Sequence, residues 1–349
     1  MKIKVGIIGC GAITRIRHAP EYFSNPDCEL AGFCDPVYER AEQMVKQYGG
    51  TAYGSYAEML SDPRIDAVSV CTSNDTHAGI SILALDSGKH VLCEKPMATT
   101  LDEAQQMIAA ARRNGKYLMI GLNQRLMPAH IKAKQILKSG QMGRVIAFKT
   151  QFKHRGPEMW SADKGVHTWF FKKKASSFGV LGDLGIHKLD LMRWLLEDEM
   201  DEVFSHLSTL DKKDEQGNFI EVEDNALCIL KTTGGITGTM EVSWCDYGEE
   251  DNSTVLYCER GVVKIYAGSE YDIILEMKDG SSVYYKTGGA STNKNQLKSG
   301  VMDAFIDSIT CSCLPDISGE EGYKSLAAII GCRTSSETGR WVKVSSRVQ

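Results

Sequence analysis

The sequence lacks long apolar runs and has no excess of positive charge. Its 349 residues carry a formal net charge of −5, and 24% of them are charged. A membrane-spanning helix needs roughly 20 consecutive apolar residues, and no stretch approaches that length. Proteins that bind nucleic acid or anionic lipid usually present a basic surface, which this composition does not supply. We therefore expect neither a membrane nor a nucleic-acid partner.

The first residues also lack the continuous apolar core of a secretory signal. Two lysines and a short apolar run open the chain, but glycines follow where a signal peptide would stay apolar. We interpret this segment as a β-strand and expect a cytoplasmic protein.

Cysteines with paired zinc-ligand spacing are absent too. Five of the eleven cysteines lie in the first hundred residues beside Val, Ile or Phe, as reduced and buried cysteines do: Cys10, Cys28, Cys34, Cys71 and Cys93. Cys311 and Cys313 form the only close pair, for which packing at a helix end is favoured over a metal or redox role. We expect no metal site.

The chain is longer than one hydrophobic core usually supports, which predicts two domains, at residues 1–124 and 125–349. In the first, short apolar runs alternate with segments of helical periodicity, which predicts a parallel sheet with helices on both faces. Strands are expected at Ile3–Ile8, Leu30–Cys34, Ala67–Cys71, His90–Cys93 and Tyr117–Gly121, and helices at Val37–Tyr48, His77–Ser87 and Leu101–Asn114.

The second domain begins with a predicted helix, Pro128–Ser139, and continues as successive strands with tight connections. These are expected at Arg144–Lys153, Val203–Leu210, Asn225–Thr232, Ile236–Trp244, Thr254–Cys258 and Val262–Ala267. Two later helices, Val301–Thr310 and Gly319–Glu337, complete an α+β domain with a large, mainly antiparallel sheet. The polar stretch Thr287–Lys298 is the best candidate for a flexible loop.

A glycine turn follows the first predicted strand, where a dinucleotide-binding site belongs. Gly9 permits a tight turn, and Gly11 lets the backbone approach a pyrophosphate at the N-terminus of the helix that begins near Ala12 and Ile13. Thr14 stands where the fingerprint has a third small residue. The strand before and the helix after support the functional interpretation over an incidental turn.

Asp35 ends the second predicted strand, where the ribose-binding acid is expected. A carboxylate there repels the extra phosphate of NADP, so NAD is favoured. Two alternatives stay open. Asp35 could merely start a turn at Pro36, and Arg40 or Arg15 could assist a phosphate, which would make NADP the cofactor.

Two further motifs follow the third and fourth strands of the first sheet, at the edge where ligands bind. Ser73-Asn74-Asp75-Thr76-His77 is one, and Glu94-Lys95-Pro96 is the other. A lysine directly after a buried strand is poorly explained as a solvated surface charge. It either serves the site or forms a structural ion pair with Glu94.

A third motif, residues 183–190, is predicted to open a helix in the second domain. Asp183 and His187 are four residues apart and share one helical face, with Asp190 the next position along it. A carboxylate beside an imidazole is a credible proton-transfer pair. A helix cap with a surface histidine would give the same spacing.

Taken together, these motifs resemble the glucose-fructose oxidoreductase / inositol dehydrogenase / MocA (Gfo/Idh/MocA) family over essentially the whole chain. The matching pieces are residues 9–13, 74–77, 88–96, 121–125, 183–190 and 336–340. Ser177-Phe178-Gly179 departs from the three glycines common there, and Ser73 from a frequent proline. The resemblance implies a Rossmann domain and a second domain. The open face of the second domain's sheet would form the subunit interface of a homodimer or homotetramer.

The resemblance also implies roles for single residues. Lys95, Asp183 and His187 would surround the reacting carbon, and Ser73, Asn74, His77, Glu94 and Asn123 would line the cofactor pocket. We expect His187 to act as acid/base, Lys95 to stabilise charge on the substrate oxygen, and Asp183 to bind a substrate hydroxyl or to orient His187.

The substrate is expected to be a polyhydroxylated small molecule: a sugar, a glycoside or a cyclitol. Aromatic and polar residues alternate in one loop-rich segment and suit such a ring: His154, Arg155, Trp160 and Trp169. A packed covering loop is the alternative. For the whole protein, three other functions compete: a redox-neutral glycosidase-type enzyme with tightly held NAD, a non-catalytic cofactor-sensing regulator and a bilin-reductase-like enzyme.

Overall fold

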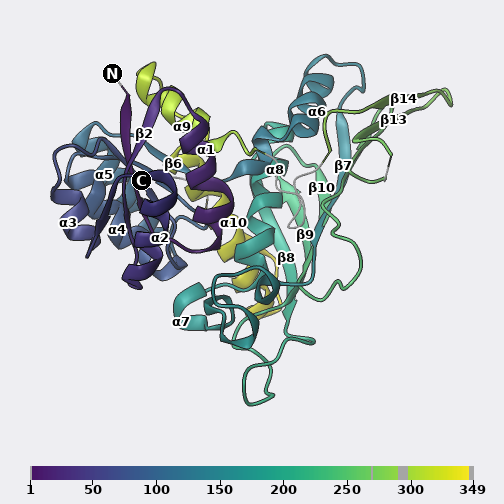
Figure 1. The fold of residues 1–349 in the computed structure, drawn as a ribbon. Helices are drawn as coiled ribbons and strands as arrows, with labels where there is room; N and C mark the ends of the chain where they lie inside the picture. Colours follow the sequence, from purple (N-terminus) through teal and green to yellow (C-terminus); the bar gives the residue numbers. More distant parts are fainter. Residues whose placement is uncertain (1, 269, 290–297, 346–349) are drawn as a thin grey trace.

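The computed structural model describes residues 2–268, 270–289 and 298–345. These residues form two β-sheets with helices packed between and around them (Figure 1). Most of the predicted loop at Thr287–Lys298 lies outside the described residues. Within the described ranges, no helix combines the length and the apolarity that crossing a membrane requires.

The first sheet has six parallel strands in the order β3-β2-β1-β4-β5-β6. The strands are β1 (Ile3–Ile8), β2 (Cys28–Cys34), β3 (Thr51–Tyr53), β4 (Ala67–Val70), β5 (His90–Cys93) and β6 (Leu118–Ile120). Their sequences are nearly continuous apolar runs, because helices cover both faces of the sheet and bury both sides of each strand. Strand β3 was not predicted, since its three residues at the sheet edge show no apolar run.

The helices of this domain are α1 (Ala19–Ser24), α2 (Tyr38–Tyr48), α3 (Tyr56–Ser61), α4 (Asn74–Asp86) and α5 (Leu101–Asn114). Capping residues determine where α5 begins and ends. Thr100 and Glu103 form a reciprocal capping box at the start of α5, and Gly115 ends it in the left-handed conformation. Helix α4 begins at Asn74, three residues before the prediction.

The second sheet has nine strands in the order β14-β13-β12-β11-β7-β10-β9-β8-β15. They are β7 (Val145–Lys153), β8 (Met200–Ser208), β9 (Asn225–Thr232), β10 (Thr237–Ser243), β11 (Thr254–Cys258), β12 (Gly261–Ile265), β13 (Ile273–Met277), β14 (Ser282–Tyr285) and β15 (Val342–Lys343). Only β7 and β10 pair in parallel, which confirms the mainly antiparallel prediction. Strands β13, β14 and β15 were missed, because they lie toward the sheet edges, where exposure weakens the alternation.

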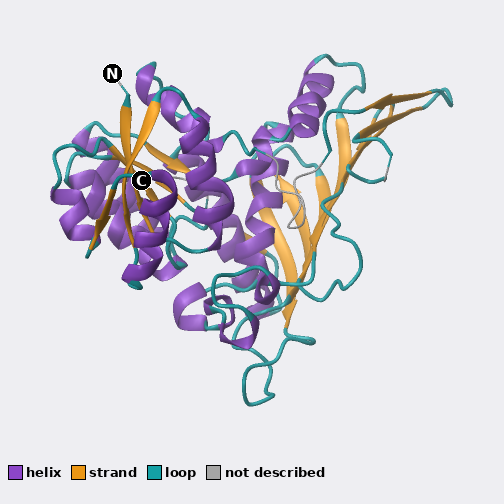
Figure 2. Cartoon of the chain, viewed as in Figure 1, coloured by secondary structure: helices purple, strands orange, loops and turns teal. Residues whose placement is uncertain are grey.

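Helices cover one face of the second sheet and leave the other open (Figure 2). This domain contains α6 (Pro128–Lys138), α7 (Lys173–Ser176), α8 (Ile186–Leu196), α9 (Val301–Thr310) and α10 (Gly319–Thr338). On the described strands of this sheet, six large apolar side chains stay exposed, namely Ile146, Leu227, Ile229, Tyr257, Val283 and Tyr284. Contiguous exposed apolar surface of this kind commonly marks an interface.

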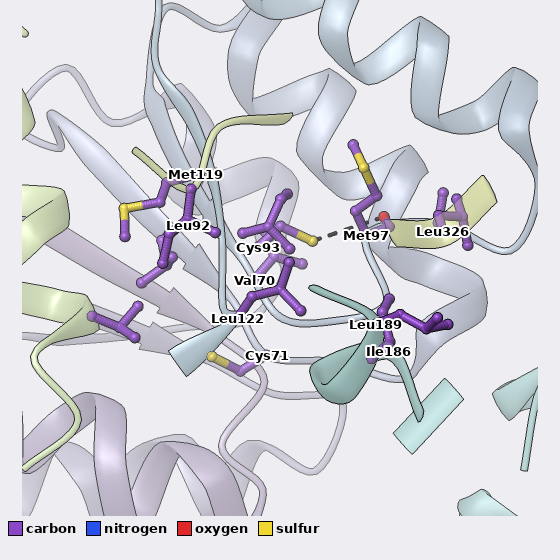
Figure 3. Packing of buried hydrophobic residues seen from close by; sticks show 14 of the residues in the cluster. Val70, Cys71, Leu92, Cys93, Met97, Met119, Leu122, Ile186, Leu189 and Leu326 are labelled. Atoms are coloured by element: carbon purple, nitrogen blue, oxygen red, sulfur yellow. Dashed lines mark hydrogen bonds between the residues drawn. The ribbon is translucent and has the colours of Figure 1, made fainter. Parts of the chain in front are cut away.

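One buried core joins the two domains beneath the crevice. Figure 3 shows Val70, Leu92, Cys93 and Met119 of the first sheet, Met97 beyond β5, and Ile186, Leu189 and Leu326 of α8 and α10. Beyond residue 298 the chain returns to the first sheet, where the backbone N–H of Ile120 donates to Ile317 O. The boundary between residues 124 and 125 remains a prediction.

A buried ion-pair network fixes α8 against α10 and against the segment that follows β6. The guanidinium of Arg125 donates to both carboxylate oxygens of Asp190, at 2.6 and 2.7 Å, and to Glu321 at 2.7 Å. Arg193 adds bonds to Glu199 and Glu321. Asp190 therefore has a structural position, although the helical spacing placed it beside Asp183 and His187. Two matching motifs, residues 121–125 and 183–190, are joined here.

Candidate active site

A cavity of about 610 Å³ lies between the two domains, lined by the turns that follow strands of the first sheet. It includes the turns after β1 and β4, where the strand order reverses, the usual ligand position in an open α/β sheet. The predicted residues that line it are Gly9, Gly11, Ala12, Ile13, Asp35, Ser73, Asn74, His77, Glu94, Lys95, Asn123, Asp183 and His187.

The glycine turn has the backbone that a pyrophosphate site requires. Gly9 has a φ of 96°, and a Cβ there would lie 2.5 Å from Cys71 O, so only glycine fits. A Cβ on Gly11 would meet no atom within 4 Å, so this position is open toward the cavity. Thr14 is compatible with the turn because its hydroxyl donates to Gly9 O at 2.6 Å.

Asp35 is 6% exposed and faces this turn. Its carboxylate accepts backbone hydrogen bonds from Cys10 at 2.7 Å and Val37 at 2.8 Å, one on each oxygen. A carboxylate has about four acceptor sites, so each oxygen can accept another bond. The glycine turn, the adjoining helix and this carboxylate together fit a dinucleotide.

Lys95, Asp183 and Trp244 form the most strongly connected group in the cavity. The Lys95 ammonium donates to Asp183 Oδ1 at 2.8 Å and to Asp183 O at 3.0 Å, and the Trp244 indole donates to Oδ2 at 3.1 Å. Burial alone would raise the pKa of Asp183, but Lys95, His154 and Trp244 hold it below the usual value. Asp183 is therefore ionised at neutral pH. No sequence motif indicated a role for Trp244, the residue directly after β10.

His187 lies at the start of α8 and is 6% exposed. Burial and the charge of Lys95 lower the pKa of His187 well below the usual value, although Asp183 acts in the opposite direction. Among the described residues, none is within hydrogen-bond distance of its Nδ1. A neutral imidazole in this cavity can accept a proton at neutral pH.

Asp183 and His187 do not stack as neighbours on a regular α-helix. Residues Leu181–Gly185 form a π-helical turn, which is wider than an α-helical one. Both oxygens of Asp183 are bonded to Lys95 and Trp244. The geometry therefore favours Asp183 as the partner of Lys95 over the alternative in which it orients His187.

Glu94 does not form the predicted alternative ion pair with the Lys95 side chain. Its Oε1 contacts His18 Nε2 at 2.9 Å, and its Oε2 accepts from the Lys95 backbone at 3.2 Å. Burial raises the pKa of Glu94, but His18, Lys95 and Arg17 outweigh this and lower it to about 2. Glu94 thus holds the backbone of the Glu-Lys-Pro turn and leaves the Lys95 ammonium to Asp183.

The Ser73–His77 turn is braced from both sides. His77 Nδ1 lies 2.8 Å from Pro96 O and its Nε2 lies 3.1 Å from Thr72 O, so the ring links two turns of the cavity. The Asn74 amide donates to Ser176 O of the second domain at 2.7 Å. Both side chains line the cavity and also fix its walls.

The segment before Asp183 is clamped by Glu223. Its Oε1 accepts from the backbone N–H groups of Gly179 at 2.8 Å and Leu181 at 3.2 Å, and its own carbonyl accepts from Val180. Burial raises the pKa of Glu223 to about 7, although these backbone bonds oppose the shift. A Cβ on Gly179 would lie 1.9 Å from Glu223 O, which explains a glycine at this position. Phe178, which stands where relatives commonly have glycine, lines the cavity, and the Arg333 guanidinium lies over its ring.

Three of the four predicted substrate residues line the cavity: His154, Trp160 and Trp169. His154 Nδ1 accepts from Gly156 N, so the proton of the neutral ring is on Nε2. Arg155 is not among the lining residues of the described chain, and its guanidinium donates to Tyr247 O instead. The prediction that Arg155 contacts the substrate is therefore wrong, because its guanidinium is bonded to this backbone carbonyl.

Cys311 and Cys313 are exposed in the turn after α9 and do not pack the helix end as predicted. Cys10, Cys28, Cys34, Cys71 and Cys93 are reduced and buried. Within the described ranges, no three His, Cys, Asp or Glu side chains gather in a way that could hold a metal ion.

Comparison with known proteins defines the class. An oxidoreductase family model with an NAD-binding Rossmann fold matches residues 3–122, and the Gfo/Idh/MocA C-terminal domain model matches residues 130–264. The chain belongs to the Gfo/Idh/MocA family of NAD-binding oxidoreductases. The resemblance inferred from the motifs and the predicted fold class are confirmed.

Several relatives match almost the whole chain. Myo-inositol 2-dehydrogenase of Thermotoga maritima is 27% identical over 98% of both chains. D-glucoside 3-dehydrogenase of Escherichia coli is 26% identical over 98% of this chain and 97% of its own. A levoglucosan dehydrogenase solved with NADH and levoglucosan shares the fold, with a TM-score of 0.87, 22% identity, and coverage of 99% of this chain and 100% of its own.

Proposed function

We propose that this chain is an NAD-dependent dehydrogenase that interconverts a secondary hydroxyl and a ketone on a sugar, a glycoside or a cyclitol. The observation that carries the proposal is the Lys95–Asp183 ion pair beside a neutral His187, in the cavity that also contains the glycine turn. Relatives named for inositol and glucoside dehydrogenation support the substrate class.

In this proposal the residues divide the work of moving a proton and stabilising charge. Bound NAD supplies a hydride acceptor at C4 of the nicotinamide. His187 takes the hydroxyl proton of the substrate. The Lys95 ammonium stabilises negative charge that develops on the same oxygen. Asp183 holds Lys95 and can accept a hydrogen bond from a neighbouring substrate hydroxyl.

NAD is proposed over NADP because of Asp35. Its buried carboxylate faces the cavity and has acceptor capacity left for ribose hydroxyls. The extra phosphate of NADP would meet a negative charge there. Measured dissociation constants for the two cofactors test this choice, and a preference for NADP would overturn it.

A substrate panel tests the function itself. Sugars, glycosides and inositols are offered with NAD, and NADH is followed by its absorbance. The proposal expects sustained NADH formation with at least one class. If a substrate is consumed while no NADH accumulates, the redox-neutral alternative replaces the proposal. If NAD binds and no member of the panel reacts, the result favours the alternative of a non-catalytic cofactor-sensing regulator.

The glycine turn yields a prediction about cofactor binding. Gly11→Ala should raise the Kd for NAD at least about tenfold, because the added methyl projects into open cavity space and would oppose close approach of the pyrophosphate. Stability should change by less than about 0.5 kcal/mol, since no protein atom is displaced. Calorimetric titration and thermal unfolding measure the two quantities.

The matched control is Gly79→Ala in α4, where an added Cβ also meets nothing within 4 Å but the glycine itself does not line the cavity. This variant should bind NAD as the parent does and gain up to about 1 kcal/mol of stability, as alanine does in helices. Unchanged NAD affinity in Gly11→Ala would remove this turn from the cofactor site.

The pKa of His187 yields a prediction about pH. Because burial and Lys95 keep the imidazole neutral, kcat/KM for alcohol oxidation should stay level as pH falls through 6.5 and decline only in more acidic solution. Lys95→Met removes one of the two causes and should raise the pKa of His187. NMR titration of the His187 ring in both proteins measures the shift, and an unchanged pKa contradicts this account.

The open face of the second sheet is proposed as a homodimer or homotetramer interface. Ile146, Leu227, Ile229 and Tyr257 are exposed side chains on strands of this sheet. Figure 2 shows helices packed over only one of its faces. Light scattering gives the mass in solution. Leu227→Lys with Ile229→Lys should lower it, whereas a monomeric parent chain would rule the proposal out.

A further inference from the structure

A loop of the second domain lines the cavity and contacts Arg40 of the first domain. Residues 160–163 line the same cavity as Asp35 and Arg40, which belong to the first domain. The residues that bind the adenosine end of a dinucleotide normally come from the Rossmann domain alone. Here the second domain adds side chains to that end.

Buried contacts hold this loop in place. The Lys212 ammonium, on a side chain only 5% exposed, binds the Glu158 carboxylate and donates to Arg155 O at 2.6 Å. The rings of Trp160 and Phe170 meet edge to face at 5.2 Å between centroids. Residues 160–163 are therefore positioned by the protein itself.

The loop contributes one charge to the adenosine end. Asp163 Oδ1 contacts the Arg40 guanidinium at 2.7 Å, while the two side chains remain 51% and 25% exposed. An ion pair this exposed adds little stability, so its importance lies in the charge it presents to a ligand. Arg40 follows Asp35 by five residues, at the start of α2.

Arg40 is the cation that could accept the extra phosphate of NADP. Of the three cationic side chains that line the cavity within the described chain, Lys95 is paired with Asp183 and Arg17 acts on Glu94 and His187. Arg15 donates to Cys10 O and is not among the lining residues. Only Arg40 lies at the Asp35 end, and Asp163 is bound to it.

We infer that Asp163 is a specificity-determining residue: it pairs with Arg40, places a second carboxylate near Asp35 and thereby disfavours NADP. The inference rests on the proposed NAD preference. NAD has no phosphate at this ribose and needs no cation there, whereas NADP would have to displace Asp163 from Arg40 or bind beside two negative charges.

Calorimetric or fluorescence titration with NAD and NADP tests the inference without any turnover. Asp163→Asn keeps the shape of the side chain and removes its charge. The ratio of the Kd for NADP to that for NAD should fall by about tenfold in this variant, which corresponds to roughly 1.4 kcal/mol. The double variant Asp163→Asn/Arg40→Ala should lose that gain, because the freed guanidinium is then absent.

Glu215→Gln is the matched control. Glu215 pairs with His167, four residues after Asp163, but does not line the cavity. The ratio of the two Kd values should therefore not change in this variant. A parent chain that prefers NADP would overturn the proposed function. A parent that prefers NAD while Asp163→Asn leaves the ratio unchanged would overturn only this inference, and so would a gain that persists without Arg40.

Discussion

Lys95→Met should lower kcat by about 10²- to 10³-fold, the loss typical of removing one group that stabilises charge in a transition state. The ammonium lies 2.8 Å from Asp183 on a side chain that is only 15% exposed, where such a charge acts more strongly than in water. His187→Asn should cost about 10²- to 10⁴-fold, because the proton acceptor is lost. Steady-state kinetics on the substrate found in the panel measures both, and titration should still detect bound NAD.

A control separates chemistry from folding. Lys89 is a buried lysine of the same domain, whose ammonium donates to Asp62 O and Ile65 O outside the cavity. Lys89→Met should lower the melting temperature and leave kcat of the folded fraction at the parent value. If Lys95→Met keeps more than a tenth of the parent kcat, Lys95 has no catalytic role.

The sequence predicted the first domain well because its signals are local. Buried parallel strands are continuous apolar runs, and helix ends carry their own chemistry, such as the Thr100–Glu103 capping box. The edge strands β3 and β14 lack this signal, because one residue of β3 and none of β14 is buried. These strands form because they pair with a neighbouring strand, and no local sequence pattern reveals such pairing.

The position of the site was predictable for a different reason. Parallel strands end at one edge of their sheet, so motifs that follow β1, β2, β4 and β5 must converge there. The structure brings Gly9, Asp35, Asn74 and Lys95 to one cavity accordingly. Their individual roles remain proposals.

Contacts between distant segments were not predictable. Trp244, Glu223 and Asp163 reach the cavity or its frame from strand ends and loops of the second domain, and each meets a partner more than 40 residues away. Periodicity carries no information about such pairs. Helical periodicity also wrongly placed Asp190 beside Asp183 and His187. It assumes a regular α-helix, so it reveals neither the π-helical turn nor the buried Arg125 that binds the Asp190 carboxylate.

Gly179→Ala should be the most destabilising single methyl addition near the site. The new Cβ would lie 1.9 Å from Glu223 O, a backbone atom that cannot rotate away. Relieving the contact requires moving either segment, at a cost of about 3 kcal/mol or more. Movement of the segment also carries Asp183 away from Lys95, so kcat should fall together with stability. Denaturant unfolding and kinetics measure the two effects.

Glu223→Gln distinguishes the backbone contact from the carboxylate. The amide oxygen of glutamine can still accept from Gly179 N and Leu181 N, so this variant should lose only about 1 kcal/mol, the difference between a charged and a neutral acceptor. Burial raises the pKa of Glu223 to about 7, above its value in an unfolded chain, so the parent gains stability by binding a proton as pH falls from 7 toward 4.5. Glutamine does not titrate, so the loss in this variant should grow over that range. Equal losses in the two variants would show that the carboxylate, and not the close approach of the two backbones, positions Asp183.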